Sequence, residues 1–113
     1  MAMPTDLLPF LAHNIRLDDG TLTKPGFHVD MSRYILFESA KRALAKIYPE
    51  GVRGKRIVDL GCLEGGYAVE FARLGMDSVG IEVRQSNFDR CMYVASKAFL
   101  PNLKFIQDDV LNI

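Results

Sequence analysis

The sequence predicts an α/β fold in which helices flank a parallel β-sheet. From residue 55 onward, short apolar runs alternate with longer stretches of helical period. The first run ends at Gly61, and Gly65 and Gly66 then open a helical stretch. This order of strand, tight turn and helix N-terminus is typical of open α/β sheets that bind nucleotide-like ligands.

The composition is that of a single globular domain without a strong net charge. The chain has 113 residues, 49% of them hydrophobic, and 14 basic residues balance 14 acidic ones. The balance gives no signal for nucleic acid or an anionic membrane, no apolar run approaches the ~20 residues of a membrane span, and the N-terminus lacks a signal-peptide pattern. Cys62 and Cys91 fit neither a disulfide framework nor a metal motif, so we expect reduced thiols in a cytoplasmic protein without a metal site.

The N-terminal quarter of the chain is expected to be irregular. Prolines and glycine-containing turns interrupt residues 1–30 throughout. Residues 15–17 and 21–23 can pair as a short hairpin around the turn between them.

Helical period begins at residue 31 and continues to residue 48. Asp30 or Ser32 can cap the start of this helix, because either side chain can accept a hydrogen bond from a free backbone amide. The residues expected on its buried face are Leu36, Phe37, Ala40, Ala43, Leu44 and Ile47.

Strands and helices then alternate strictly. Strands are predicted at residues 55–60, 78–83 and 103–107, with helices at 66–74 and about 86–98 between them. Strands joined by crossovers of this length form right-handed parallel units. The core stripe of the second of these helices is expected to comprise Phe88, Cys91, Met92, Ala95 and Phe99.

This alternation predicts a Rossmann-like parallel sheet that is truncated after its third strand and preceded by an N-terminal helix. We divide the chain into an irregular N-terminal segment, residues 1–30, and a partial Rossmann-like domain, residues 31–113. Because three strands form half of a doubly wound sheet, the first strand becomes an exposed apolar edge. Either the chain is a fragment of a longer product, or two chains cover each other's edges as a homodimer, and we expect the isolated chain to self-associate.

Every predicted strand brings an acid to its carboxyl end, where open sheets bind ligands. These acids are Asp59, Glu82 and the pair Asp108 and Asp109. A carboxylate at the end of a buried strand is costly unless loop amides or a ligand satisfy it, which applies to Asp59. Glu82 follows 23 residues later and is placed to accept hydrogen bonds from two ribose hydroxyls, although a solvated charge is the alternative.

The turn after the first strand has two interpretations. Gly61, Gly65 and Gly66 either permit positive φ and close helix packing, or let a ligand approach the backbone, and the residues leave both open. Glu64 lies in the same turn, so that Asp59 and Glu64 predict a negative pocket. Such a pocket disfavours a pyrophosphate and favours a cationic ligand.

The run from Val58 to Gly66, Val-Asp-Leu-Gly-Cys-Leu-Glu-Gly-Gly, resembles the first motif of class I S-adenosylmethionine-dependent methyltransferases. The resemblance covers about residues 31–113, and it implies that this loop lies under the methionine part of the cofactor. It implies that Glu82 holds both ribose hydroxyls, and that Asp109 accepts from the adenine amino group. Leu63 departs from the pattern, because the family often has glycine there. The implied cofactor-binding residues are Asp59, Gly61, Cys62, Leu63, Gly65, Glu82, Val83, Asp108, Asp109 and Val110.

The resemblance implies S-adenosylmethionine (SAM) as the cofactor and methyl transfer to an unidentified acceptor, with this chain supplying the cofactor-binding half. SAM carries a sulfonium and an ammonium against one carboxylate, so acids suit it, whereas they oppose the two phosphate charges of NAD. The alternatives are a catalytically inactive SAM-binding fragment and the NAD(P)-binding half of a dehydrogenase.

The sequence assigns no catalytic residue. His28 is a candidate general base, but a lone histidine near a turn is more often structural. Tyr67 and Phe71 are expected to pack in the core. Positioning of the acceptor supplies much of the rate of a methyl transfer, so a strong base is not required.

Overall fold

The computed structural model describes residue 7 and residues 9–112. Its elements in chain order are η1 (Met31–Arg33), α1 (Ile35–Ile47), β1 (Arg56–Leu60), α2 (Gly66–Arg73), β2 (Asp77–Glu82), α3 (Gln85–Ala98), β3 (Leu103–Gln107) and η2 (Val110–Asn112). The strands form a parallel sheet in the order β1-β2-β3. The predicted Rossmann-like α/β fold is confirmed, and every strand boundary agrees to within one residue.

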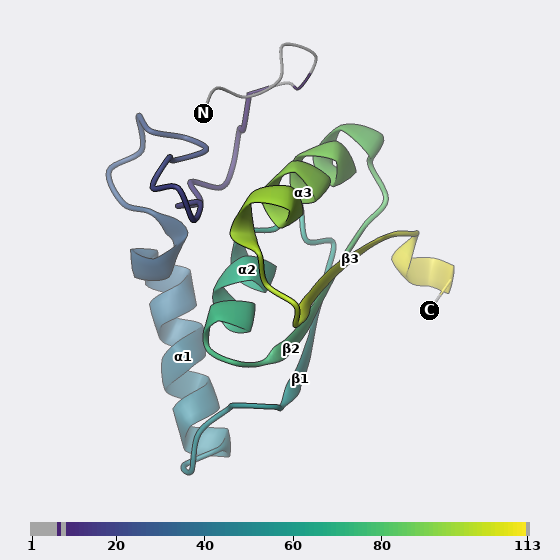
Figure 1. Cartoon of the computed structure of the whole chain (residues 1–113). Helices are drawn as coiled ribbons and strands as arrows, with labels where there is room; N and C mark the ends of the chain where they lie inside the picture. The colour runs from purple at the N-terminus through teal and green to yellow at the C-terminus, as the bar shows by residue number, and fades with distance from the viewer. Residues whose placement is uncertain (1–6, 8, 113) are drawn as a thin grey trace.

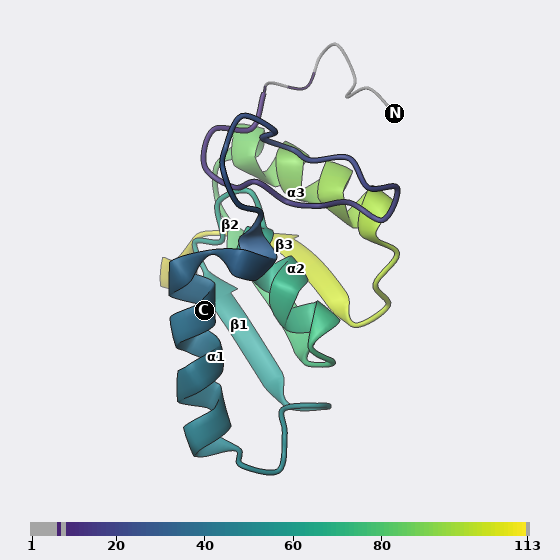
Figure 2. The same ribbon diagram turned by 90° about the vertical axis from the view of Figure 1, so that its left-hand side faces the viewer.

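Helices α1, α2 and α3 lie on the same side of the sheet (Figure 1), and the turned view shows them in front of the strands (Figure 2). Val69 of α2 and Val94 of α3 are buried in one apolar cluster. Phe37 of α1 and Phe71 of α2 are buried in a second cluster, against which Ile57 of β1 packs. The apolar core therefore lies between the sheet and this single helical layer.

The opposite face of the sheet is apolar and open. Val58, Leu60 and Ile106 are 52%, 59% and 41% exposed. Leu60 is in register with Ile81, and Ile81 is in register with Ile106, so these side chains form a row across the strands. In the described part of the chain β1 pairs with β2 alone, which leaves β1 as the exposed edge that the sequence predicts.

The helix predicted over residues 31–48 is interrupted at Tyr34. A short 3-10 turn, η1, comes first, and Tyr34 then adopts an extended ψ of 137° before α1 begins. Asp30 caps η1 as predicted, since its side chain accepts a hydrogen bond from the Ser32 amide. The two short elements thus replace the single long helix that the period alone indicates.

The buried face of α1 is narrower than predicted. Phe37 is buried, and Ala40 and Leu44 are half-buried, whereas Leu36, Ala43 and Ile47 are exposed. The reason is that α1 packs on the molecule only along the cluster around Phe71, so residues to either side of that line meet solvent.

The core stripe predicted for α3 is also displaced. The buried residues are Arg90, Cys91, Val94 and Ala98, whereas the predicted Met92 and Phe99 are exposed and Phe88 and Ala95 are half-buried. The helix ends at Ala98, and Phe99 takes a left-handed φ of 51° as its cap, with its side chain exposed.

The predicted N-terminal hairpin is present. Arg16 and Leu22 form an antiparallel bridge, and the Thr23 amide donates to the Ile15 carbonyl at 3.0 Å. Ile15 is fully buried, together with Phe10, in the cluster that α2 and α3 share. The segment before α1 is therefore packed against the helical layer.

Candidate functional site

The loop that leaves β1 is fixed to the neighbouring strand. The amides of Gly61 and Cys62 both donate to the Ile81 carbonyl, at 2.8 and 2.9 Å. The Asp108 amide, after β3, donates to the Glu82 carbonyl at 3.3 Å. The carboxyl ends of all three strands are thus held together, and they bring the predicted acids to the same edge of the sheet.

The glycines of this loop serve different purposes. Gly61 and Gly65 both have positive φ, 70° and 90°. A Cβ atom on Gly65 would lie 2.6 Å from the Phe105 ring, so close packing excludes a side chain there. A Cβ atom on Gly61 would meet nothing within 4 Å. Close packing therefore explains Gly65, whereas the space beside Gly61 leaves room for a ligand to approach the backbone, which stays a prediction.

Leu63 adopts the left-handed conformation, with φ of 53°. For a residue with a side chain this region costs about 1–2 kcal/mol, which explains why glycine suits the position better. Leu63 is held there because its amide donates to Glu82 Oε1 at 2.9 Å and its carbonyl accepts from the Cys91 thiol at 3.1 Å. Its side chain is half exposed at the rim of the site.

Glu82 connects the first two strand ends. It is 5% exposed, and its second oxygen accepts from the Arg84 amide at 3.0 Å. Because each carboxylate oxygen has two lone pairs, one acceptor position on each oxygen is left for a ligand hydroxyl. The geometry is compatible with the predicted ribose contact, which stays a prediction.

Asp59 has unmet hydrogen-bonding capacity at this edge. Among the described residues its Oδ2 atom is buried and has no hydrogen-bond partner. Burial raises the pKa of the Asp59 carboxyl, and the nearby Glu82 carboxylate raises it further. A buried polar atom of this kind calls for a donor, such as a cationic ligand group.

The structure corrects the place given to Glu64 in the negative pocket. Glu64 is 1% exposed, and its oxygens accept hydrogen bonds from the amides of Leu11, Ala12 and His13 at 2.7–2.9 Å. Arg90 Nε lies 3.6 Å from its carboxylate. Its charge is therefore enclosed by the N-terminal segment and α3, and the negative character of the pocket depends on Asp59 and Glu82.

The two cysteines help to fix the loop that follows β1. Cys62 and Cys91 are free and buried, with their Sγ atoms 3.8 Å apart. The Cys62 thiol beside it and burial both raise the pKa of Cys91, so its thiol stays protonated. Because the Cys62 side chain is buried, any contact that this residue makes with a ligand involves its backbone.

The acids after β3 organise a short turn. Asp108 accepts from the Asp109 amide and from Asn112, and these hydrogen bonds lower the pKa of Asp108. Asp109 accepts from the Leu111 amide at 2.9 Å, at the start of η2. Val110 is exposed at this rim, and so is Val83 beyond β2. The implied contact of Asp109 with the adenine amino group, and the cofactor-binding roles of Asp108, Val110 and Val83, stay predictions.

Sequence reasoning missed one histidine near the loop. His13 is 6% exposed, and its Nδ1 atom accepts from the Gly66 amide at 2.9 Å. Its ring meets the edge of Tyr67, with centroids 5.5 Å apart. Only a long-range contact reveals it, because His13 and Gly66 are 53 residues apart in the sequence. His28, the predicted candidate base, is exposed.

The expectation of a core position is correct for Phe71 and incomplete for Tyr67. Phe71 is buried, whereas Tyr67 is half-buried. Burial raises the pKa of the Tyr67 phenol, and the neighbouring Tyr34 and Asp59 raise it further. Tyr67 therefore lies at the margin of the core, where its ring packs against His13 and Tyr34.

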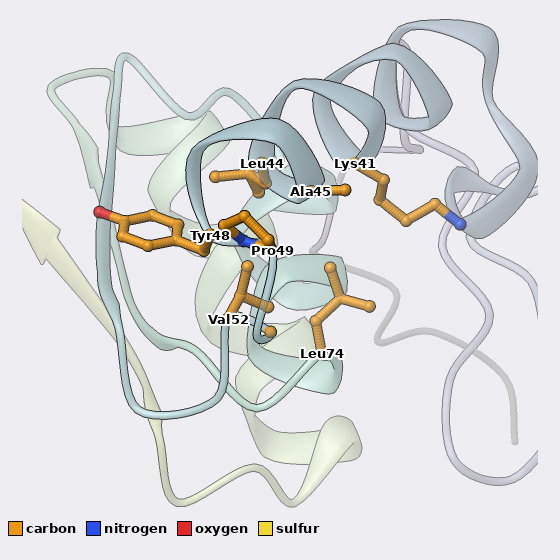
Figure 3. Close-up of a pocket in the computed structure, with 8 residues that line it drawn as sticks. Lys41, Leu44, Ala45, Tyr48, Pro49, Val52 and Leu74 are labelled. Atoms are coloured by element: carbon orange, nitrogen blue, oxygen red, sulfur yellow. The ribbon is translucent and has the colours of Figure 1, made fainter.

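A separate apolar pocket of about 260 Å³ lies where α1 ends (Figure 3). None of the predicted site residues lines it; its walls comprise Lys41, Leu44, Ala45, Tyr48, Pro49, Gly51, Val52 and Leu74. Over the described residues, no group of three His, Cys, Asp or Glu side chains is arranged to hold a metal ion. None of the described helices has the length and apolarity needed to cross a membrane.

No protein-family model matches the sequence, and no curated protein matches it. Several solved structures match the chain. The N-terminal domain of EvdMO1 with SAH bound is 28% identical with a TM-score of 0.56, and the match covers 68% of this chain and 32% of that one. The same domain in the presence of SAH and D-fucose is 26% identical with a TM-score of 0.59, covering 84% and 38%. Monomeric WbdD is 20% identical with a TM-score of 0.61, covering 71% and 19%.

This chain spans about a third of the matched EvdMO1 domain and a fifth of WbdD. The likeness to these structures confirms what the motif after β1 predicts: the chain has the class I methyltransferase fold.

Proposed function

We propose that this chain binds SAM at the carboxyl ends of β1, β2 and β3 and belongs to a methyltransferase. The observation that carries the proposal is the buried, unpartnered Oδ2 atom of Asp59, beside a second carboxylate on Glu82. A ligand with a positive charge satisfies both, and SAM is a net cation. The EvdMO1 domain that was solved with SAH, the demethylated form of SAM, supports the same cofactor class.

Each strand end has its own role in the proposed complex. The open backbone at Gly61 and the rim at Leu63 receive the methionine part, and Cys62 and Gly65 hold that loop in shape. Glu82 accepts from the ribose hydroxyls with its free lone pairs. The exposed Val83 and Val110 enclose the adenine, Asp109 accepts from its amino group, and Asp108 fixes the turn that carries Asp109.

Methyl transfer follows from the cofactor's own chemistry, since its sulfonium activates the methyl group for displacement. This chain's residues bind and orient the cofactor, and the chain forms the cofactor-binding part of the enzyme. The partial coverage of EvdMO1 supports this division. D-fucose is the first acceptor to test, because an EvdMO1 structure was solved in its presence. Transfer of labelled methyl from SAM to an acceptor separates a working enzyme from a binding fragment.

Calorimetric titration tests cofactor binding directly. We expect wild-type protein to bind SAM and SAH, and Glu82→Gln to weaken both at least about tenfold, because hydrogen bonds to a charged group contribute about 1.5–3 kcal/mol each. Glu50→Gln makes the same chemical change at an exposed turn and is the matched control. Melting curves verify that each variant is folded. Binding of NAD in place of SAM would instead support the dehydrogenase alternative, and equal SAM affinity in the Glu82 variant would refute the site.

We also propose that a second copy of the chain covers the open sheet face. Val58, Leu60 and Ile106 are exposed apolar side chains on the face beside the unpaired edge of β1, and such edges pair with other strands unless they are protected. Sedimentation should show a dimer for the wild type and a monomer for Leu60→Lys. Ile47→Lys, at an equally exposed apolar site on α1, should stay dimeric. A monomeric wild type would refute the proposed dimer.

A cytoplasmic location is the final element of the proposal. Cys62 and Cys91 are close enough for contact and are both free thiols, which suits a reducing compartment. Alkylation after denaturing acid quench of cells should label both thiols. Full protection of both from alkylation would place the protein in an oxidising compartment.

A further inference from the structure

The segment before α1 is tied to the cofactor loop by buried polar contacts. Glu64 accepts hydrogen bonds from three successive backbone amides, those of Leu11, Ala12 and His13. The His13 side chain makes a further hydrogen bond between the two segments, since its Nδ1 atom accepts from the Gly66 amide. Glu64 of the loop and Gly66 at the start of α2 are therefore both hydrogen-bonded to residues 11–13.

Both contacts are well enclosed. Glu64 is 1% exposed and His13 is 6% exposed. A Cβ atom on Gly66 would lie 2.9 Å from the His13 ring, so the ring lies directly against the backbone at the start of α2. Removing either partner would leave a buried donor or acceptor unsatisfied, which is costly inside a protein.

A second attachment holds the rest of the segment. Arg73, near the end of α2, donates to the Arg16 carbonyl at 2.6 Å and lies 3.3 Å from the Asp18 carboxylate. Ile15 and Leu17 are buried between these two attachments. The segment therefore spans α2 from its first residue to its last, and Figure 2 shows it passing in front of α3.

Glu64 and Gly66 are each adjacent in sequence to a left-handed residue of the cofactor loop. Glu64 follows Leu63, whose left-handed conformation depends on bonds to Glu82 and Cys91. Gly66 follows Gly65, which is also left-handed. A strained loop of this type keeps its shape only when surrounding contacts fix it.

We propose that residues 10–23 act as a strap that holds the cofactor loop in its binding conformation, with His13 and Glu64 as the positioning residues. This inference rests on the proposed function for its ligand, and it goes beyond that function by making the N-terminal segment part of the site. Neither side chain needs to touch the cofactor. Their effect passes through the backbone of residues 63–66.

Hydrogen exchange on the wild-type protein tests the coupling without any mutation. Because coupling between sites is reciprocal, saturating SAH should slow exchange of the Leu11, Ala12 and His13 amides. Unchanged exchange at these amides while SAH is bound would overturn the proposal.

Variants of His13 separate positioning from general stability. His13→Ala should raise the Kd for SAH roughly tenfold, equivalent to about 1.4 kcal/mol, and should speed exchange of the Leu63 amide. His13→Asn should retain most of the affinity, because its Oδ1 atom lies as many bonds from the backbone as Nδ1 does. Ile15→Ala weakens the packing of the same segment without touching the loop, and should leave the Leu63 amide and the affinity close to wild type. If His13→Ala does not fold, Glu64→Gln provides the same two measurements.

The outcomes are distinct from those of the proposed function. If wild-type protein binds no SAM or SAH, the proposed function fails, and faster Leu63 exchange in His13→Ala still supports the strap. If SAH binds but Ile15→Ala and His13→Ala weaken it equally at matched stability, or if His13→Asn is as weak as His13→Ala, the segment has a merely structural role and the strap is refuted.

Discussion

Replacing Asp59 by asparagine should separate the charge preference of the site from its shape. Asp59→Asn keeps the size of the side chain and removes one negative charge beside Glu82. SAM carries one more positive charge than SAH, so the two ligands should respond differently. We expect the variant to lose affinity for SAM and to keep most of its affinity for SAH.

The expected loss follows from Coulomb's law. A unit positive charge about 6 Å from a carboxylate, at an effective dielectric constant of about 20, is stabilised by about 3 kcal/mol. Asp59 is only half-buried, so solvent screening reduces this by about half, to roughly a tenfold change in the Kd for SAM. The free protein should become more stable by about 1 kcal/mol, because a neutral amide costs less to bury than a carboxylate and is not repelled by Glu82.

Isothermal titration with both ligands, together with thermal melting, measures these effects. Asp77→Asn makes the same change at the exposed, opposite end of the sheet and should alter neither the affinity nor the SAM-to-SAH ratio. An equal loss of SAM and SAH binding in Asp59→Asn would mean that Asp59 acts on the ammonium that both ligands share or through loop geometry, and the reasoning from the sulfonium charge would be wrong.

Three further changes have defined outcomes. Leu63→Gly should stabilise the protein by about 1 kcal/mol, seen as a higher melting temperature, because it relieves a left-handed residue; no change would show that the Leu63 side chain compensates by packing. Gly65→Ala should unfold or strongly destabilise the chain in chemical denaturation, because its Cβ atom would overlap the Phe105 ring, whereas Gly61→Ala should be milder. The pKa of His13 is lowered from 6.5, mainly by burial and against the attraction of Glu64, so stability should be complete above pH 6.5 and decline as pH falls below it. Denaturation midpoints should show this decline, and His13→Asn should reduce it.

The strands are the part of the fold that the sequence predicts best. Residues 103–107 form β3 as predicted, because a proline and an asparagine end the preceding helix and the apolar run that follows is short. The left-handed positions at Gly61 and Gly65 in the loop after β1 are equally predictable, because glycine is the residue that adopts this conformation most readily. Local conformational preferences therefore suffice for these elements.

The buried faces of the helices and the contacts of the N-terminal segment could not be predicted in this way. Met92 and Phe99 have the right spacing for a core stripe, yet the helical layer covers only one face of the sheet and α3 ends before Phe99. His13 and Glu64 give no local signal at all, because their partners lie more than 50 residues away. Such contacts depend on how the layers pack, which the period of a single segment does not encode.

The position of Glu64 changes the argument for a cationic ligand without removing it. The sequence predicts that Asp59 and Glu64 form one negative pocket, but three amides and Arg90 compensate the charge of Glu64. Asp59 and Glu82 are left as the charges that a ligand meets, and the unpartnered oxygen of Asp59 has no such compensation. A pyrophosphate placed at Gly61 would thus face one uncompensated carboxylate, and a sulfonium or an ammonium there would satisfy it. Discrimination between SAM and NAD therefore depends mainly on Asp59, and Asp59→Asn should narrow it while Glu64→Gln, which acts on the strap, should weaken both ligands alike.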